Sequence, residues 1–245
     1  MISGKTLAII TARGGSKRIP GKNIKPFCGR PIISYSITAA LESGLFDEVM
    51  VSTDSAEIRD LAVSYGASCP FMRTEENSGD FATTADVIKE VLTEYERLGR
   101  KFDRYCVIYP TAPFITAERL REAFRILEDA GADFLTPVAA FSQPVFRGFV
   151  IEPDGQLKKK WPEYQNVRTQ DLPKLYYDCG EFYIGSAEKI FTVPYEERNM
   201  VAMVLPEEEV QDIDTPSDWL TAEEKYRKLF GKREESGIET GTGDQ

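Results

Sequence analysis

The sequence contains no histidine among its 245 residues. This absence excludes Ser-His-Asp and Cys-His catalysis, and it excludes zinc or iron sites with histidine ligands. Any bound metal would have to be a hard cation held by oxygen atoms. Any general base would have to be Asp, Glu, Lys, Tyr or a bound hydroxide.

Long apolar runs and paired cysteines are also missing. No run approaches the roughly 18 apolar residues of a membrane-spanning helix, and no charged-then-apolar leader opens the chain. The cysteines form no Cys-x-x-Cys pair, so we expect reduced thiols and a cytoplasmic protein; they are Cys28, Cys69, Cys106 and Cys179. The net charge of −10 argues against general binding to nucleic acid or to membrane surfaces.

A basic glycine loop stands out against this acidic background. Residues 12–23 follow an apolar run and read Ala-Arg-Gly-Gly-Ser-Lys-Arg-Ile-Pro-Gly-Lys-Asn. The paired glycines permit a tight turn and let backbone N–H groups approach a ligand closely. We predict a phosphate site in which cations neutralise a triphosphate and two neutral side chains add hydrogen bonds: Arg13, Lys17 and Lys22, with Ser16 and Asn23. A solvated basic loop is the alternative.

Two familiar phosphate loops do not fit this segment. The spacing of Gly15 and Gly21 is one residue too long for a Walker A loop, and Asn23 stands in place of its hydroxyl residue. The pattern Gly-x-Gly-x-x-Gly of dinucleotide-binding folds is absent as well. We therefore expect a phosphate loop of another kind.

Strands and helices alternate through the first half of the chain. Apolar runs predict strands at residues 7–11, 48–52, 67–72, 105–109 and 134–138, with helices at 31–42, 55–65, 83–98 and 116–130. This order predicts an α/β fold with three layers, in which a mostly parallel, Rossmann-like sheet lies between helices. Ligands of such sheets bind at the carboxyl ends of the strands, so the loops after residues 11, 52, 72 and 109 should share one rim.

The pattern changes after residue 139. Residues 141–180 suggest a β-rich flap or dimerisation arm, with an irregular surface loop as the alternative. Residues 181–184 and 201–205 predict returning strands, and Thr215 should cap a last helix. We expect one domain over residues 1–231 and a disordered tail over 232–245.

An aspartate pair lies before the last helix. Asp212 and Asp214 alternate in an extended segment, so both carboxylates can face one site. Such a pair suits Mg²⁺, which keeps several waters and bridges phosphate oxygens. Helix capping by Asp214 or Thr215 is the alternative.

A third polar group precedes the helix predicted at residues 83–98. Arg73 is followed by Ser78, Asp80, Thr83 and Thr84, which could read a nucleobase or ribose. Ordinary capping by Thr83 or Thr84 is the alternative. Residues 109–114, with two prolines, add a rigid loop to the same rim. Together these features indicate a nucleotide-dependent transferase without a covalent nucleophile.

These motifs resemble those of cytidylyltransferases that activate nonulosonic acids, the sialic-acid-like sugars. Residues 12–23, 51–54, 109–113 and 211–215 match family motifs in the same order, and the resemblance covers about residues 5–228. Residues 109–114 and 178–183 are similar to the branch that uses pseudaminic acid. The resemblance implies the sheet of nucleotide-diphospho-sugar transferases and transfer of CMP from CTP to the anomeric hydroxyl of the sugar, with release of pyrophosphate.

The resemblance also implies roles for individual residues. The catalytic set would be Arg13, Lys17, Lys22, Asp212 and Asp214. The two aspartates would hold Mg²⁺, with Mn²⁺ as an alternative and Asp214 as the primary ligand. The nucleotide would contact Ala12, Arg13, Gly14, Ser16, Lys17, Lys22, Asn23, Arg73, Ala82 and Thr84.

The implied sugar contacts are Tyr109, Arg147, Arg168, Gln170, Tyr177 and Asp178, with Arg147 near the sugar carboxylate. Family members are typically homodimers whose insertion reaches the partner's site. Three departures bear on the sugar. Tyr109 stands where sialic acid synthetases usually carry Gln, Tyr177 where the pseudaminic branch usually has His, and Glu181 where that branch tends to Gln. Pseudaminic acid is therefore favoured, with N-acetylneuraminic and legionaminic acid as alternatives.

Two other classes of protein remain in competition. One is a glycosyltransferase that cleaves a nucleotide sugar, with Asp54 or the aspartate pair as its metal motif. The other is a non-catalytic nucleotide-binding or assembly protein. The catalytic base is left open among a metal-bound hydroxide, Asp212 and solvent.

Overall fold

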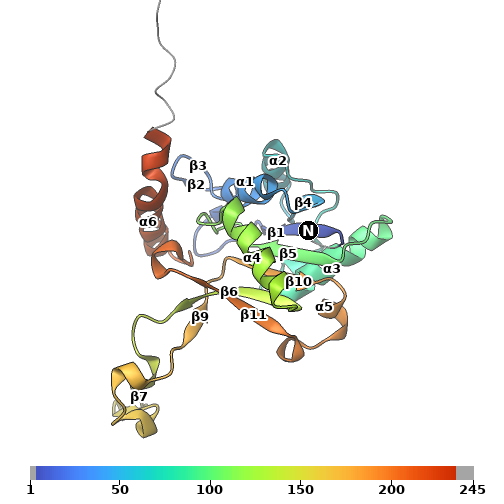
Figure 1. Ribbon diagram of the computed structural model, residues 1–245. Coiled ribbons are helices and arrows are strands. Elements are labelled where there is room, and N and C mark those ends of the chain that lie inside the picture. Colours follow the sequence, from blue (N-terminus) through green and yellow to red (C-terminus); the bar gives the residue numbers. More distant parts are fainter. Residues whose placement is uncertain (1–3, 236–245) are drawn as a thin grey trace, which may run out of the picture.

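A mostly parallel sheet forms the centre of the computed structural model, which describes residues 4–235 (Figure 1). The main strands lie in the order β11-β6-β10-β5-β1-β4, and β9 pairs with the outer end of β6. Only β9 and β10 run antiparallel to their neighbours in this sheet. The strands are β1 (Thr6–Thr11), β4 (Glu48–Ser52), β5 (Arg104–Ile108), β6 (Phe134–Ala140), β9 (Tyr176–Asp178), β10 (Phe182–Ser186) and β11 (Met200–Leu205).

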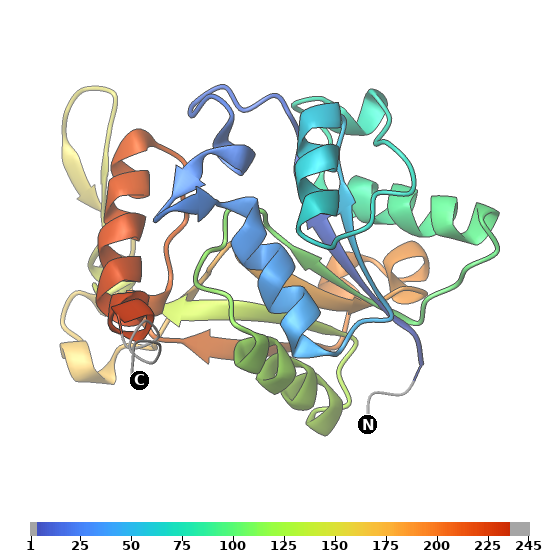
Figure 2. The ribbon, with the colours of Figure 1, turned by 90° about the horizontal axis from the view of Figure 1, so that it is seen from above.

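Helices cover both faces of this sheet (Figures 1 and 2). On one face, α1 (Ile33–Ser43), α2 (Ala56–Ser64) and α4 (Ala117–Asp129) bury Ile37, Ile58 and Leu120 against the strands. On the other face, α3 (Thr84–Arg97) and α5 (Lys189–Thr192) bury Val91 and Ile190. This arrangement confirms the predicted three-layer α/β fold.

Helix boundaries follow from capping residues in the sequence. The hydroxyls of Ser55, Thr83 and Thr116 each accept a hydrogen bond from a main-chain N–H in the first turn of α2, α3 and α4. Gly44 ends α1 with a φ of 65°, a conformation that glycine adopts without steric cost. The capping alternative is therefore correct for Thr83.

The strand predicted at residues 67–72 is wrong. The structure has only an isolated parallel bridge there, between Ser68 and Met50. Ser68 donates its N–H to the carbonyl oxygen of Val49 and accepts the N–H of Val51. Pro70, two residues further on, has no N–H to continue a ladder of this kind.

An arm projects from the body where β6 ends (Figure 1). It carries a hairpin of β7 (Phe149–Ile151) and β8 (Leu157–Lys159), and the chain returns through β9. Inside the arm, the ring of Phe146 packs against those of Trp161 and Tyr164. The arm is thus held together by its own small cluster rather than by the core of the body.

A third cluster joins the last helix to the segment after the glycine loop. The helix α6 (Pro216–Glu235) packs Trp219 and Tyr226 against Phe27 of the small ribbon formed by β2 (Pro26–Phe27) and β3 (Arg30–Pro31). This helix extends beyond residue 232, at which a disordered tail was predicted, so residues 232–235 are helical. Residues 236–245 of the predicted tail lie outside the described residues.

Short 3-10 helices occupy several of the connections. They are η1 (Lys22–Ile24), η2 (Glu76–Ser78), η3 (Val145–Arg147), η4 (Pro162–Tyr164), η5 (Thr169–Asp171), η6 (Tyr195–Glu197) and η7 (Glu207–Glu209). Over residues 4–235, no helix combines the length and the apolar character that crossing a bilayer requires.

Candidate active site

A cavity of about 640 Å³ opens at the carboxyl ends of β1 and β5, on the rim predicted from the strand order. Nine of the predicted site residues line it: Arg13, Ser16, Lys17, Lys22, Asn23, Arg73, Ala82, Thr84 and Tyr109. Its wall also includes Arg18, Asn77, Asp80 and Thr111 from the same loops, and Val87 from α3. Segments far apart in the sequence thus form one strongly polar pocket.

The glycine loop is fastened at its base. Asn23 is buried and donates its side-chain N–H to the carbonyl oxygen of Arg13 at 2.8 Å. The N–H of Gly14 is donated to Asp54 Oδ1 at 2.8 Å, and Ala12 is buried with its N–H bonded to Ser52. Ala12 and Gly14, both predicted to contact the nucleotide, are not among the residues that line the cavity; Ala12 is buried, whereas Gly14 is exposed.

Gly15 remains open where Gly14 is engaged. A Cβ at Gly15 would meet no heavy atom of the described residues within 4 Å, whereas a Cβ at Gly14 would lie 3.2 Å from Ser55. The backbone at Gly15 can accordingly be approached closely by a phosphate group.

Two cations of the loop reach across the cavity to the segment before α3. Arg13 Nη1 donates to Asp80 Oδ1 at 3.1 Å and to the carbonyl oxygen of Gly79 at 3.3 Å. Lys17 donates to the other oxygen of Asp80. The sequence singled out Asp80 only as one residue of a polar segment, so this contact was not predicted.

The other two cations join the loop to the predicted metal segment. Lys22 Nζ donates to the carbonyl oxygen of Ile213 at 2.6 Å and lies 3.7 Å from Asp214 Oδ1. Arg18 Nη2 donates to the same carboxylate oxygen of Asp214 at 2.7 Å. The glycine loop and the aspartate pair are thus parts of one site, although 189 positions separate Asn23 from Asp212.

The aspartate pair has the character of a hard-cation site. Burial and the nearby charge of Asp214 raise the pKa of Asp212, and a divalent cation would relieve both effects. Within residues 4–235, no cluster of three or more Cys, Asp or Glu side chains is arranged to hold a metal. Two carboxylates nevertheless fit Mg²⁺, because this ion takes its remaining ligands from water and substrate phosphates.

The floor of the cavity combines an arginine with two hydroxyl groups. Arg73 is buried and donates Nε to Ser52 Oγ at 2.9 Å and Nη2 to Ser52 O at 2.6 Å. Burial lowers the pKa of Arg73, opposed by the charge of Asp54. Thr84 Oγ1 lies 3.2 Å from Tyr109 Oη, so Thr84 faces the pocket while Thr83 caps the helix.

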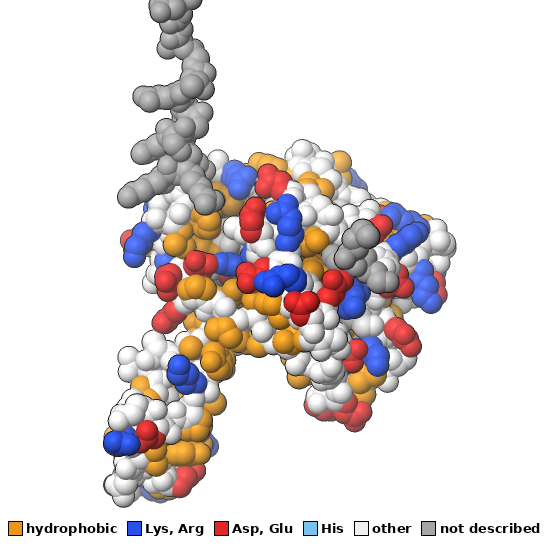
Figure 3. Space-filling view, viewed as in Figure 1, with side chains coloured by type: hydrophobic (Ala, Val, Ile, Leu, Met, Phe, Trp, Pro, Cys, Tyr) orange, Lys and Arg blue, Asp and Glu red, His pale blue; other side chains and the backbone are white. Residues whose placement is uncertain are grey.

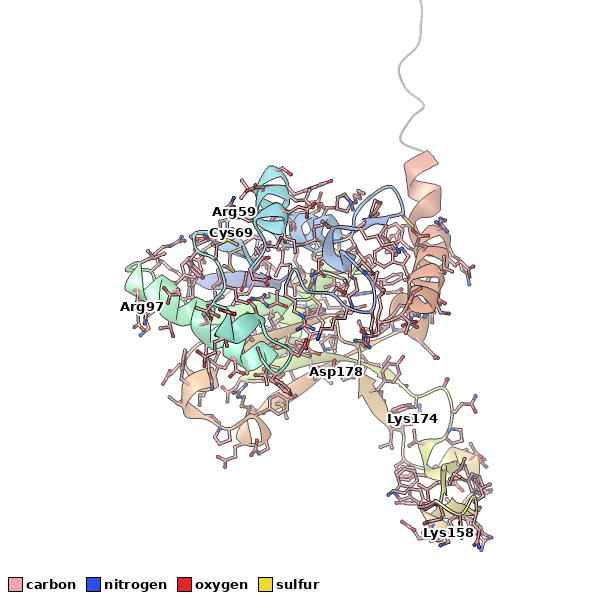
Figure 4. All side chains as sticks on the ribbon, turned by 180° about the vertical axis from the view of Figure 1, so that it is seen from behind. Arg59, Cys69, Arg97, Lys158, Lys174 and Asp178 are labelled. Carbon is pink, nitrogen blue, oxygen red and sulfur yellow. The ribbon has the colours of Figure 1, made fainter. Side chains whose placement is uncertain are left out.

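Two of the predicted sugar residues lie where the arm joins the body. Asp178 accepts the hydroxyl of Tyr183 at 2.8 Å and the N–H of Gly180 at 2.8 Å, and Tyr183 packs edge-on against Tyr109 of the cavity wall. Tyr177 packs against Phe141 at the base of the arm. Figure 4 shows Asp178 at this junction, with Lys158 near the far end of the arm.

Three predicted sugar residues lie in the arm and do not line the cavity of their own chain. The guanidinium of Arg147 donates to the carbonyl oxygens of Gln165 at 2.8 Å and of Val167, so it holds the turn of the arm. Arg168 is paired with Asp171 at 2.8 Å, and Gln170 is exposed beside it in η5. The arm's own folding therefore uses Arg147.

A buried charged cluster beside the site was not predicted as a unit. Glu181 is only 1% exposed, and both of its carboxylate oxygens lack a hydrogen-bond donor among the described residues. Arg119 Nη1 lies 3.6 Å away, donates to Phe114 O at 3.1 Å, and the same guanidinium is paired with Glu209. Burial raises the pKa of Glu181 to about 7, because the charge of Arg119 offsets the desolvation only in part. A charged residue at the start of an apolar strand was the available signal.

Comparison with known proteins gives a consistent result. The family model described as cytidylyltransferase matches residues 7–204. A pseudaminic acid cytidylyltransferase of Campylobacter jejuni (serotype O:2) is 38% identical over 228 residues, which is 91% of this chain and 97% of that protein. The CMP-N,N'-diacetyllegionaminic acid synthase of Legionella pneumophila is 32% identical over 89% of this chain and 95% of that protein.

Among solved structures, CMP:2-keto-3-deoxy-manno-octonic acid synthetase complexed with CTP superposes with a TM-score of 0.65. The superposition covers 94% of this chain and 99% of that chain, at 18% sequence identity. At this identity the likeness concerns the fold alone.

Proposed function

Because this chain belongs to the cytidylyltransferase family, we propose that it transfers the cytidylyl group of CTP to the anomeric hydroxyl of pseudaminic acid. Pyrophosphate is the second product. The observation that carries the proposal is the cavity in which four cations of the glycine loop meet Arg73, Thr84 and Tyr109. The identity to pseudaminic acid cytidylyltransferases, at 38% and 36%, favours that sugar over legionaminic and N-acetylneuraminic acid.

The residues of the cavity suit the parts of CTP. Arg13, Lys17 and Lys22 would neutralise the triphosphate, and the open backbone at Gly15 would take a phosphate oxygen. Ser52 accepts two of the five N–H donors of Arg73, so the remaining donors can reach an oxygen of the base or ribose. Asn23 would act by holding the loop in shape as well as by lining the cavity.

The chemical step is an in-line displacement at phosphorus. The anomeric oxygen of the sugar forms a bond to the α-phosphorus as the bond from that phosphorus to the bridging oxygen of pyrophosphate breaks. The proton of the hydroxyl passes to solvent or to Asp212. Positioning of the two reactants and neutralisation of the phosphates supply most of the rate acceleration that this chain provides.

We assign Mg²⁺ to Asp212 and Asp214, with Mn²⁺ as an alternative. When bound, the ion would draw charge from the phosphate oxygens during transfer. Lys22 and Arg18 hold the aspartate segment against the glycine loop, so the cation and the triphosphate would meet at that junction. The raised pKa of Asp212 and the absence of histidine from the chain both support an oxygen-ligated cation.

The sugar pocket would include the junction of arm and body. Tyr109 and Asp178 are coupled through Tyr183, and Tyr177 lies at the base of the arm. Arg147, Arg168 and Gln170 lie in the arm and do not line the cavity of their own chain, so we assign them to the arm that would approach the site of a partner subunit.

A homodimer is the assembly that we propose. Hydrophobic side chains gather at the base of the arm and along the adjoining edge of the body (Figure 3). The exposed large hydrophobic residues of this area and of the hairpin are Phe141, Phe149, Val150, Ile151, Leu157, Leu175, Tyr176, Met200 and Val204. Light scattering coupled to size exclusion tests the dimer, and Ile151→Asp with Val204→Asp should shift it toward monomer.

The cytoplasm is the compartment that we propose for this reaction. Cys69, Cys106 and Cys179 take part in no disulfide among residues 4–235, as expected in a reducing compartment.

An assay of pyrophosphate release tests the function. Purified protein is mixed with CTP, MgCl₂ and a panel of nonulosonic acids. Release that depends on pseudaminic acid supports the proposal. Cleavage of a nucleotide sugar instead of CTP would identify a glycosyltransferase, and CTP binding without release with any sugar would identify a non-catalytic nucleotide-binding protein.

A further inference from the structure

Asp80 is bonded to two of the cations that are proposed to bind the phosphates of CTP. Its Oδ1 accepts a hydrogen bond from Arg13 at 3.1 Å, and its Oδ2 accepts one from Lys17. The two cations also hold the pKa of Asp80 below its usual range, with Lys17 as the larger cause. A carboxylate from a distant segment therefore already sits where phosphate oxygens would bind.

The segment that carries Asp80 is anchored to α3 at both ends, and its tip contacts the glycine loop. On one side, Asn77 donates to Glu90 of α3 at 2.7 Å. On the other side, Thr83 and Asp86 form a reciprocal capping box at the start of the same helix. Between these anchors, Phe81 is 99% exposed. Residues 79–82 can therefore move away from the glycine loop without uncovering the core.

The geometry points to Asp80 as an internal counter-anion that competes with the phosphates of CTP and with product pyrophosphate for Arg13 and Lys17. This inference rests on the proposed function. Pyrophosphate carries more negative charge than one carboxylate, so it displaces Asp80 from the two cations. Because the Asp80 carboxylate is tethered nearby, it binds these cations again whenever pyrophosphate partly dissociates. Asp80 thus weakens the binding of pyrophosphate and promotes its release.

The expected size of the effect is modest. Both ion pairs are partly exposed to solvent, with Lys17 the more exposed cation. Exposed ion pairs contribute little individually, so removal of the competition should tighten pyrophosphate binding about three- to tenfold.

Calorimetric titration of inorganic pyrophosphate and of CTP tests the inference. The proteins are the wild type, Asp80→Asn, and Glu76→Gln, which removes a negative charge from an exposed position of the same segment. We expect Asp80→Asn to bind pyrophosphate about three- to tenfold more tightly than Glu76→Gln does, with or without MgCl₂. Equal or weaker binding would overturn the inference, and weaker binding only with MgCl₂ would make Asp80 a metal ligand instead.

A double-mutant cycle tests whether Asp80 acts by competing for Lys17. In a Lys17→Met background, the gain from Asp80→Asn should shrink, because one of the two contested cations is gone. An undiminished gain would contradict competition for Lys17. If the wild type binds neither CTP nor pyrophosphate, the proposed function fails together with this inference. If it binds both and Asp80→Asn brings no gain, only the inference fails.

Discussion

The ammonium group of Lys22 lies 2.6 Å from the carbonyl oxygen of Ile213, between the two aspartates assigned to the metal. Through this contact the phosphate loop at one end of the sequence holds the metal segment at the other. The same ammonium group is 3.7 Å from Asp214 Oδ1. Under the proposed function Lys22 would have two roles: it would neutralise phosphate charge, and it would set the distance between the nucleotide and the metal.

Removal of the Lys22 ammonium group should severely reduce turnover. We expect Lys22→Met to lower kcat/KM for CTP by about 100-fold or more, because a charge directed at the reacting phosphates is lost in a pocket. Steady-state pyrophosphate release measures this. The matched control is Lys101→Met, which removes an exposed lysine far from the cavity and should leave kcat/KM within about twofold. A Lys22→Met protein with near-normal kcat/KM would contradict the role given to Lys22.

Loss of the Asp214 carboxylate should reduce kcat far more than it reduces the affinity for CTP. We expect Asp214→Asn to reduce kcat by about 100-fold or more, whereas the affinity for CTP changes less because the cations of the glycine loop remain. Single-turnover kinetics with a separate CTP titration measure the two quantities. Asp218→Asn is the control, since the Asp218 carboxylate accepts the main-chain N–H groups of Asp214 and Thr215 at the start of α6 but is not assigned to the metal. Its loss should lower stability by about 1 kcal/mol and not abolish turnover. Equal loss of CTP affinity and kcat in Asp214→Asn would argue against a metal role.

Glu181 makes stability depend on pH. Its folded-state pKa is raised from the ordinary 4.5 to about 7, so the folded protein holds this proton more tightly than the unfolded chain. The free energy of unfolding should therefore fall as the pH rises from about 5 to about 7 and level off above that range, by about 3 kcal/mol in total. In Glu181→Gln the dependence in this range should largely disappear, and the variant should be the more stable protein at pH 8.

Urea denaturation at several pH values measures this effect. The control is Glu118→Gln, which removes an exposed carboxylate of α4 and should keep the wild-type pH dependence. If Glu181→Gln lowers the free energy of unfolding equally at pH 5 and pH 8, the carboxylate is not the titrating group.

The variant Tyr109→Phe tests whether the Tyr109 hydroxyl contacts the sugar or the nucleotide. Tyr109→Phe removes the hydroxyl that lies 3.2 Å from Thr84 Oγ1 and keeps the ring packed against Tyr183. The loss of one neutral hydrogen bond should raise KM for a substrate about two- to tenfold and leave stability nearly unchanged. If Tyr109 contacts the sugar, KM for pseudaminic acid rises; a rise in KM for CTP alone would place its hydroxyl in the nucleotide site.

Much of the fold could be predicted because the local signals agree with the packing. Ser55, Thr83 and Thr116 begin helices as their side chains favour, and apolar runs at residues 7–11 and 105–109 form central strands. The strand predicted at residues 67–72 is wrong because this apolar segment packs beside the edge strand β4 and forms one isolated bridge with it, not a ladder.

The sequence allowed prediction of which charged residues lie at the site, but not of which residues contact one another there. Crowding beside glycines predicts Arg13, Lys17 and Lys22 as phosphate ligands, and all three line the cavity. That Asp80 faces Arg13 and Lys17 depends on the path of a loop, which periodicity does not determine. Arg147 likewise looked available for a sugar carboxylate, but its guanidinium meets carbonyl groups that only the folded arm brings together.

Mass spectrometry of the product formed from CTP and a mixture of nonulosonic acids identifies the transferred nucleotide and the sugar in one experiment. Incubation with MgCl₂ should yield one main product with the mass of CMP joined to pseudaminic acid, together with pyrophosphate. A product built on N-acetylneuraminic or legionaminic acid would keep the reaction and change the sugar. Unchanged CTP with every sugar, from a folded sample, would contradict the account.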